Sequence, residues 1–365
     1  MRKGRGGMQT PWGELGGLDL SDHELCGTIL ANEKHQLAEG LVVEGLFDQI
    51  FDDVPAHLQG AVLLDVDTAI VDTQRPDDRW HAFVWARSRQ PGLGRYLAAL
   101  GSRFHVWLVE TDRPLTNFFA REYQEGQLGQ HVWPLDRLMG ELSGKPPSYL
   151  SVTADVRDAK RQQQSFWGFL SDQHGPALGE RIILPRLFMN YGVQPWFRAV
   201  WNLDRILVHN DQIWLLEIKH KFPFGRSALA FGLNTGELGV IARLGEAGIR
   251  CLHTILVKPI WSKDVGAMYL FNDMRMRGRA ALIGIDLSQS VTADMMAGQR
   301  GLSAGHTTFT GTGALNYYSL NAASFSRLGV LSDSPSFIAA NIAALVHGTK
   351  LDRVDDRWLR SLAGQ

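Results

Sequence analysis

The sequence predicts an α/β protein with more than one domain. Strand-like and helix-like apolar patterns alternate along the 365 residues, which is typical of layered α/β architectures. Hydrophobic residues form 45% of the chain, and this length suits roughly two domains. We expect a flexible lead-in at 1–19, an N-terminal α/β domain at 20–160, a second α/β domain at 161–290, and an extension at 291–365 that packs on the second domain or forms an oligomer contact.

The N-terminal domain has helical apolar spacing first and a strand-like run next. The run contains Asp65 and Asp67 within Ala61-Val-Leu-Leu-Asp-Val-Asp-Thr-Ala-Ile-Val, and its apolar character predicts burial. The expected elements are a helix at 36–51, a strand at 60–71, a helix after Pro91, a strand at 104–111, a short apolar run at 149–152 and a Gln-rich helix at 156–170.

The second domain contains a predicted β-hairpin. Two apolar runs flank the polar turn His209-Asn-Asp-Gln212, which is typical of a hairpin. An earlier helical pattern contains Pro185, whose ring removes a backbone hydrogen bond. The expected elements are a helix at 176–192, strand-like residues at 196–202, hairpin strands at 203–209 and 213–220, a helix at 234–247, and strands at 250–260 and 281–285.

The hairpin carries three charged residues in an apolar setting. Glu217 and Lys219 are separated by one residue, so they point to the same face of their strand. A turn at about Asn210 and Asp211 places Asp204 near both of them. Charges in such a setting are costly unless they are paired or collected by a metal ion. The simplest structural interpretation is a cross-strand ion pair, whereas converging carboxylates with a lysine also suit metal-assisted hydrolysis.

These residues and their order resemble the PD-(D/E)xK nuclease superfamily, which has the restriction-endonuclease-like fold. The resemblance covers about residues 170–262 and implies an αβββαβ core. It implies that Asp204 and Glu217 bind Mg²⁺ or Mn²⁺, with Glu180 as an auxiliary ligand, and that Lys219 orients the attacking water. The family often has Gln or Lys in the following helix, where this chain offers Asn234 and Glu237.

The resemblance implies a metal-dependent nuclease that hydrolyses DNA phosphodiester bonds, in defence, restriction or mobile-element processing. Residues 160–290 carry more basic than acidic residues, which suits contact with a phosphate backbone. Nucleic acid is the expected partner, together with a partner protein or a second copy of the chain. The candidate backbone-binding residues are Lys221, Arg226, Lys258, Lys263, Arg275 and Arg277.

The N-terminal domain resembles the haloacid dehalogenase-like fold in a few motifs. Asp65 and Asp67 correspond to its paired aspartates after a strand, Thr111 to the end of its second strand, and Lys145 to its lysine. The spacing after Asp67 lacks one residue of the usual pattern. The resemblance implies either a phosphohydrolase acting through Asp65 and Asp67 or a degenerate scaffold. A third interpretation of the whole chain is a catalytically inactive nucleic-acid-binding or assembly protein.

Composition excludes several other classes. The two cysteines, Cys26 and Cys251, are too few for a disulfide framework or a thiolate zinc site. The first residues lack the apolar region of a secretion signal, and no apolar run reaches the roughly 18 residues that would span a bilayer. We therefore expect a cytoplasmic protein without a membrane partner.

Overall fold

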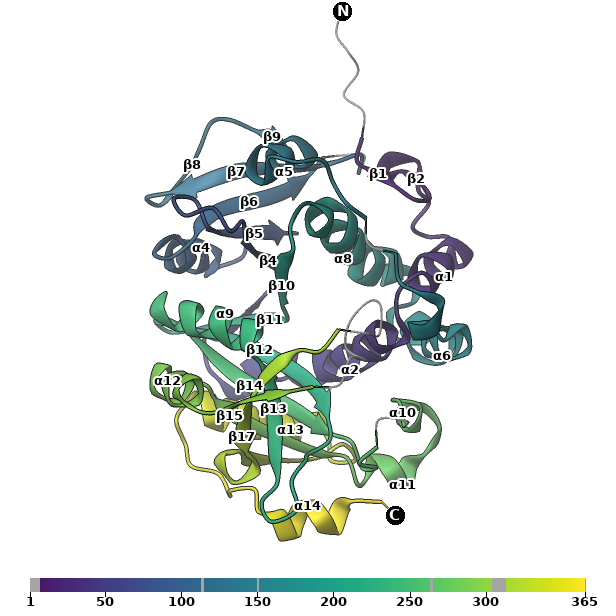
Figure 1. The fold of residues 1–365 in the computed structure, drawn as a ribbon, viewed down its shortest axis with the longest axis vertical. Coiled ribbons are helices and arrows are strands. Elements are labelled where there is room, and N and C mark those ends of the chain that lie inside the picture. The colour runs from purple at the N-terminus through teal and green to yellow at the C-terminus, as the bar shows by residue number, and fades with distance from the viewer. Residues whose placement is uncertain (1–6, 113–114, 150, 263–264, 304–312, 365) are drawn as a thin grey trace, which may run out of the picture. The chain divides into compact units, whose positions relative to one another are not determined.

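The chain forms two compact units, each built from segments that are far apart in sequence. The computed structural model describes residues 7–112, 115–149, 151–262, 265–303 and 313–364 (Figure 1). Unit 1 comprises Met1–Asn32, Leu64–Ser151 and His174–Leu203, and unit 2 comprises Glu33–Leu63, Val152–Gln173 and Asp204–Gln365. The α/β class is confirmed. The contiguous ranges expected from the sequence differ from this interleaved division, in which residues 291–365 belong to unit 2.

Unit 1 contains a mixed seven-stranded sheet with the strand order β10-β4-β5-β6-β7-β8, and β9 pairs with β7. Its β5 and β6 are parallel, whereas β4 pairs antiparallel with both β5 and β10. The strands are β4 (Val66–Asp72), β5 (Trp80–Ala86), β6 (His105–Thr111), β7 (Phe118–Gln124), β8 (Gln127–Leu128), β9 (Trp133–Pro134) and β10 (Ala199–Leu203), with a separate pair β1 (Gln9–Thr10) and β2 (Gly13–Glu14).

The helices of unit 1 include a segmented stretch around Pro185. Pro185 lies in the first turn of α8, where a missing backbone N–H is tolerated, and wider π-helical turns precede and follow it. The helical segments are η1 (Leu15–Gly17), α1 (His23–Ala31), α4 (Leu93–Gly101), α5 (Leu135–Ser143), η4 (Gly175–Ala177), η5 (Gly179–Ile183), α8 (Leu184–Leu187), η6 (Phe188–Val193) and η7 (Gln194–Trp196). The preceding α7 (Ser171–His174) belongs to unit 2 except for His174.

Unit 2 is built on a six-stranded sheet with the strand order β18-β15-β14-β12-β11-β3, beside a small sheet β13-β17-β16. β12 and β14 are parallel, and β11 and β12 form an antiparallel hairpin. The strands are β3 (Val62–Leu64), β11 (Arg205–His209), β12 (Gln212–Lys221), β13 (Ala230–Asn234), β14 (Ile249–Val257), β15 (Ala281–Asp286), β16 (Arg300–Leu302), β17 (Asn316–Asn321) and β18 (Ser326–Val330).

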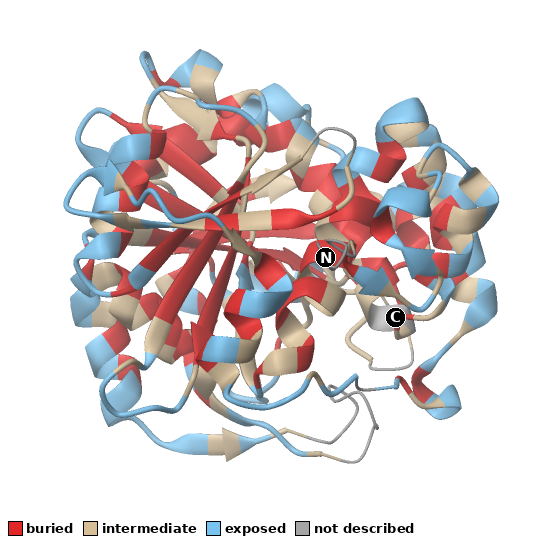
Figure 2. Ribbon diagram, turned by 90° about the horizontal axis from the view of Figure 1, so that it is seen from above, coloured by how far each residue is buried: buried red, intermediate tan, exposed pale blue. Residues whose placement is uncertain are grey.

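Helices of unit 2 pack on this sheet: α2 contacts β12, α9 contacts β14 and α13 contacts β18. Buried residues concentrate along the strands of the sheets, and exposed residues lie on outer helix faces and loops (Figure 2). The helical segments are α2 (His35–Phe51), α3 (Val54–His57), η2 (Ala154–Val156), α6 (Ala159–Ser165), η3 (Phe166–Leu170), α9 (Thr235–Glu246), α10 (Tyr269–Asn272), α11 (Met274–Arg277), α12 (Gln289–Ala297), η9 (Ala322–Ser324), α13 (Pro335–Val346) and α14 (Asp356–Leu362).

Three expectations about strands need correction. The apolar run at 60–71 is divided at Asp65 into β3, which pairs in the sheet of unit 2, and β4, which pairs in the sheet of unit 1. The described residues of the run at 149–152 form no strand. The strand expected at 196–202 exists as β10, but it pairs with β4 of unit 1 rather than with the Asp204 hairpin. Apolar patterning identifies a strand but not its partner, since partners are chosen by tertiary packing.

Candidate active site

The β11–β12 hairpin has the register that the sequence predicts. Arg205 lies opposite Leu216 and His209 opposite Gln212, so Asp204, directly before β11, approaches the level of Glu217. Its carboxylate Oδ2 accepts a hydrogen bond from the backbone N–H of Ile218 at 2.7 Å. The tight turn places Asn210 at a φ of 52°, a left-handed conformation that asparagine tolerates better than most residues.

Glu217 and Lys219 point to one face of β12 and are joined there by a residue from α9. The Lys219 ammonium forms an ion pair with the Glu217 carboxylate and a second with Glu237 at 3.1 Å. The Glu217 side chain is 5% exposed and that of Lys219 is 26% exposed. The lysine is therefore the more accessible member of this pair.

Glu237 is positioned by the start of α9. The Asn234 side chain accepts hydrogen bonds from the backbone N–H groups of Gly236 and Glu237, which is the usual function of an N-cap residue. The Asn234 side chain is thus engaged in capping the N-terminus of α9. Glu237, in the first turn of this helix, is the residue that contacts Lys219. A carboxylate in the first helical turn is also favoured by the helix dipole.

A fourth acidic residue, Glu44 of α2, is distant in sequence from Asp204, Glu217, Lys219 and Glu237 but interacts electrostatically with Asp204. Its negative charge helps to raise the pKa of Asp204, and α2 packs against β12 within unit 2. We did not predict Glu44 from the sequence. The available signal was that Glu44 and Asp48 lie four residues apart in the helix that the apolar spacing predicted.

The position of Glu180 differs from the expectation. Glu180 is an exposed residue of η5 in unit 1, whereas Asp204, Glu217, Lys219, Glu237 and Glu44 all belong to unit 2. The helix and strand that precede the hairpin within the sheet of unit 2 are α2 and β3. Of the three acidic residues of α2, which are Glu39, Glu44 and Asp48, Glu44 is the one whose charge acts on Asp204.

Burial and mutual repulsion shift the pKa values of the carboxylates. Burial raises the pKa of Asp204 to about 6, with Lys219 opposing the shift and Glu44 reinforcing it. Burial, followed by the negative charge of Asp204, also raises the pKa of Glu217 well above its usual value. When two neighbouring carboxyl groups ionise, their negative charges repel each other, and a cation bound between them stabilises the ionised form of both.

Lys219 and Glu237 respond in the opposite way. Burial alone would lower the pKa of Lys219, but the surrounding carboxylates of Glu217, Glu237 and Asp204 raise it well above the usual range. Burial would raise the pKa of Glu237, yet Lys219 and Lys221 lower it to about 2. At neutral pH Glu237 is therefore a carboxylate and Lys219 is an ammonium.

The donor set suits a hard cation in its chemistry. Asp204 and Glu217 supply carboxylate oxygens, which Mg²⁺ and Mn²⁺ prefer, and burial together with neighbouring negative charges raises the pKa of both groups. Among the residues that the structure describes, no three His, Cys, Asp or Glu side chains are already arranged to hold a metal ion. In this arrangement Lys219 supplies the compensating positive charge.

His253 is a further member of the cluster that the sequence did not reveal. It lies beside Glu217 across the parallel β12–β14 pair and is 2% exposed. Burial lowers the pKa of His253 to about 3, so its ring is neutral. Within the described ranges, Nδ1 of this ring has no hydrogen-bond partner.

Two of the candidate backbone-binding residues donate hydrogen bonds to nearby backbone carbonyls. Lys221 Nζ donates to the Gly232 carbonyl at 2.6 Å, and Lys258 Nζ donates to the Val265 carbonyl at 3.0 Å, so both lysines serve the fold locally. Arg226 is exposed beyond β12. Arg275 and Arg277 lie on the short helix α11, with Arg275 exposed, and Lys263 lies outside the described residues.

Asp65 and Asp67 form a closed ion-pair network in unit 1. Arg87 contacts Asp65 at 3.1 Å and also pairs with Asp67, while Arg181 contacts Asp65 at 3.1 Å. The Arg87 guanidinium lies over the Trp85 ring at 4.4 Å. Asp65 directly follows β3, and Asp67 lies near the beginning of β4. Both carboxylates are therefore ion-paired with arginines of unit 1.

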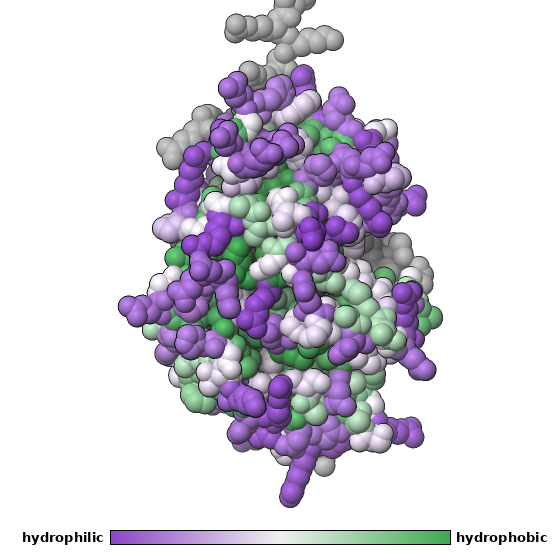
Figure 3. Space-filling model, turned by 90° about the vertical axis from the view of Figure 1, so that its left-hand side faces the viewer, coloured by the Kyte–Doolittle hydropathy of each residue, from purple (hydrophilic) through white to green (hydrophobic). Residues whose placement is uncertain are grey.

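The hydropathy of the surface does not distinguish a further site. On the face shown in Figure 3, hydrophilic and hydrophobic side chains are interspersed. Among the described residues, none of the helices combines the length and hydrophobicity required to cross a bilayer. Comparison with protein-family models, with curated proteins and with solved structures found no match to this chain.

Proposed function

We propose that unit 2 is a metal-dependent nuclease domain that hydrolyses DNA phosphodiester bonds. The observation that carries the proposal is the meeting of Asp204, Glu217 and Lys219 at one partly accessible site. Among the strands of the six-stranded sheet and the helices that contact it, the order α2, β3, β11, β12, α9 and β14 supports it, because the resemblance to PD-(D/E)xK nucleases implies an αβββαβ order.

Each side chain has a distinct task in this proposal. Asp204 and Glu217 would hold Mg²⁺ or Mn²⁺, which when bound would polarise a phosphodiester oxygen and offset its negative charge. Lys219, held charged by Glu237, would donate hydrogen bonds to the attacking water or to a phosphate oxygen. Glu44 would add negative charge near Asp204 and so favour cation binding.

The test is cleavage of supercoiled plasmid and of single-stranded DNA by the full chain with Mg²⁺, with Mn²⁺ or with EDTA. We expect metal-dependent cleavage that falls at least about 100-fold in Asp204→Asn and in Lys219→Ala, because each removes a group that acts on the reacting phosphate. The matched controls are Asp77→Asn and Lys145→Ala, both at exposed positions. Cleavage that survives Lys219→Ala would contradict the assignment.

The second candidate function is a catalytically inactive nucleic-acid-binding or assembly protein. The observation that favours it is that Lys219 contacts both Glu217 and Glu237, as in a purely structural ion-pair network. This function predicts no metal-dependent cleavage by the unmodified chain. It also predicts DNA retention that weakens as salt increases.

A further inference from the structure

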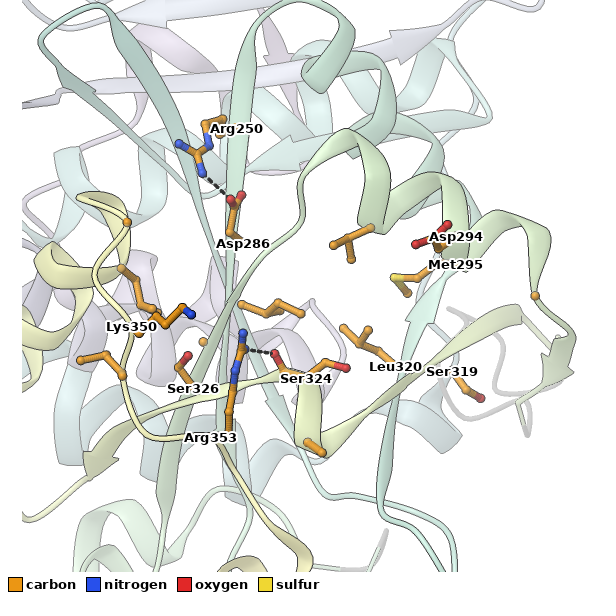
Figure 4. Close-up of a pocket in the computed structure, with 18 of the residues that line it drawn as sticks. Arg250, Asp286, Asp294, Met295, Ser319, Leu320, Ser324, Ser326, Lys350 and Arg353 are labelled. Carbon is orange, nitrogen blue, oxygen red and sulfur yellow. Dashed lines mark hydrogen bonds and ion pairs between the residues drawn. The ribbon is translucent and has the colours of Figure 1, made fainter.

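A second concave site lies in unit 2, built from residues that the proposed nuclease chemistry does not use. It is a cleft of about 1170 Å³ between α12 and β17 on one wall and β18 with the segment 348–353 on the other (Figure 4). All its lining residues lie in the described part of the chain. Cleft volumes of several hundred Å³ or more are typical of small-molecule sites.

One wall of the cleft presents two cations and a hydroxyl group. Lys350 and Arg353 extend toward the same part of the cleft, beside Ser326 (Figure 4). The backbones of Ser326 and Arg353 form a β-bridge, which fixes their proximity. Arg353 uses Nη1 to donate to the Ser324 carbonyl at 2.6 Å, so part of its guanidinium remains available.

Two side chains of the cationic wall have no partner among the described residues. Lys350 has no ion-pair partner within the described residues. Ser326 is a residue only 4% exposed, yet its hydroxyl makes no hydrogen bond to any described residue. Two cations directed at one region repel each other, and an anion between them would accept hydrogen bonds from all three side chains.

The opposite wall has a different character. Leu320 and Met295 provide apolar surface, and the exposed carboxylate of Asp294 lies at its edge (Figure 4). The other acidic group of the cleft, Asp286, is already paired with Arg250. The cleft is therefore cationic at one end and apolar with a hydrogen-bond acceptor at the other.

We propose that this cleft binds a small phosphorylated ligand of the nucleoside monophosphate class. Its phosphate lies against Lys350, Arg353 and Ser326, its flat apolar base lies against Leu320 and Met295, and its hydroxyl or amino groups donate to Asp294. The concave shape and the acidic group on the far wall favour this ligand over an extended nucleic-acid backbone, which a continuous basic surface would bind better. The proposal does not depend on the nuclease assignment.

The test is calorimetric titration of the full chain with AMP, GMP, CMP and UMP, beside the four matching nucleosides and inorganic phosphate as separate arms. We expect at least one nucleotide to bind, and to bind at least about 10-fold more tightly than inorganic phosphate or the matching nucleoside. Lys350→Gln should weaken binding about 10-fold, since it removes a charge-assisted contact, and Ser326→Ala should weaken it about 3-fold.

A matched variant makes the result decisive. Lys160→Gln removes an exposed lysine outside the cleft and should leave nucleotide affinity unchanged. Four outcomes overturn the proposal: no nucleotide binds at millimolar concentration, phosphate alone binds as tightly as the nucleotide, affinity survives Lys350→Gln and Ser326→Ala together, or a DNA oligonucleotide displaces the nucleotide and loses affinity in the same variants.

Discussion

The charge balance around Lys219 determines what the candidate active site can bind. One ammonium faces the carboxylates of Glu217, Glu237 and Asp204, which together raise its pKa against the effect of burial. Glu237 has a pKa of about 2, so at neutral pH its negative charge balances the positive charge of Lys219. The acidic groups of Asp204 and Glu217 then have no further cation of the cluster to balance them. A site with this excess of acidic groups favours a cation as its next ligand.

The same residues show how much of the site the sequence could predict. Asp204, Glu217 and Lys219 were predictable because a short turn fixes the register of a hairpin. Glu44 and His253 were not, because α2 and β14 reach the hairpin only through tertiary packing. The Glu180 prediction relied on the helix nearest in sequence, and the helix that packs on the sheet of unit 2 is α2.

His81 gives a pH-dependent prediction at the residue scale. The Trp107 indole N–H donates to His81 Nδ1 at 3.1 Å, so the neutral ring carries its proton on Nε2, which contacts the Asp78 carboxylate at 2.9 Å. Burial lowers the pKa of His81, with Asp78 opposing. Because the folded pKa lies below the unfolded value of about 6.5, its contribution to stability is present above that pH and is lost as pH falls through the folded pKa.

We therefore expect the free energy of unfolding to decrease below about pH 6.5, with His81 contributing up to about 1.4 kcal/mol per pH unit. Urea unfolding between pH 7.5 and 5 measures this slope, which should be shallower in His81→Gln. His131→Gln, at an exposed position, should keep the original slope. Identical slopes in His81→Gln and the unmodified chain would show that His81 is not held neutral by the fold.

At the scale of elements, the β11–β12 turn sets the register on which the site depends. Asn210 has a φ of 52°, where a β-branched side chain is strained by about 1–2 kcal/mol. Asn210→Val should lower the free energy of unfolding by that amount, and Asn210→Gly should leave it nearly unchanged. Gln212→Val, two residues later in an exposed strand position, is the control. Equal stability of both valine variants would contradict the prediction.

The elements themselves were largely predictable. The helices at 36–51 and 234–247 and the strands of the hairpin appear as α2, α9, β11 and β12, because their apolar spacing is regular. The division of 60–71 at Asp65 was not predictable. The residues on both sides of Asp65 are mostly apolar, and pairing with β11 or with β5 separates β3 from β4.

At the scale of the whole molecule, the chain passes repeatedly between the two units. Residues 64–151 and 174–203 of unit 1 both lie in sequence between β3 and β11 of unit 2. We expected a contiguous domain boundary near residue 160. Chain length and apolar periodicity do not indicate that a later segment pairs with an earlier unit. Each unit is completed only after distant segments pair, as β4 does with β10.

This interleaving predicts how the protein behaves when it is cut. A specific protease site inserted after Lys145, in the loop that follows α5, divides the chain into fragments that both contribute to unit 1 and to unit 2. The nicked protein should elute from a size-exclusion column at the volume of the intact chain, and its fragments should separate only in denaturant, because each fragment supplies strands that the other requires. Release of two folded fragments without denaturant would instead indicate contiguous domains divided near residue 160.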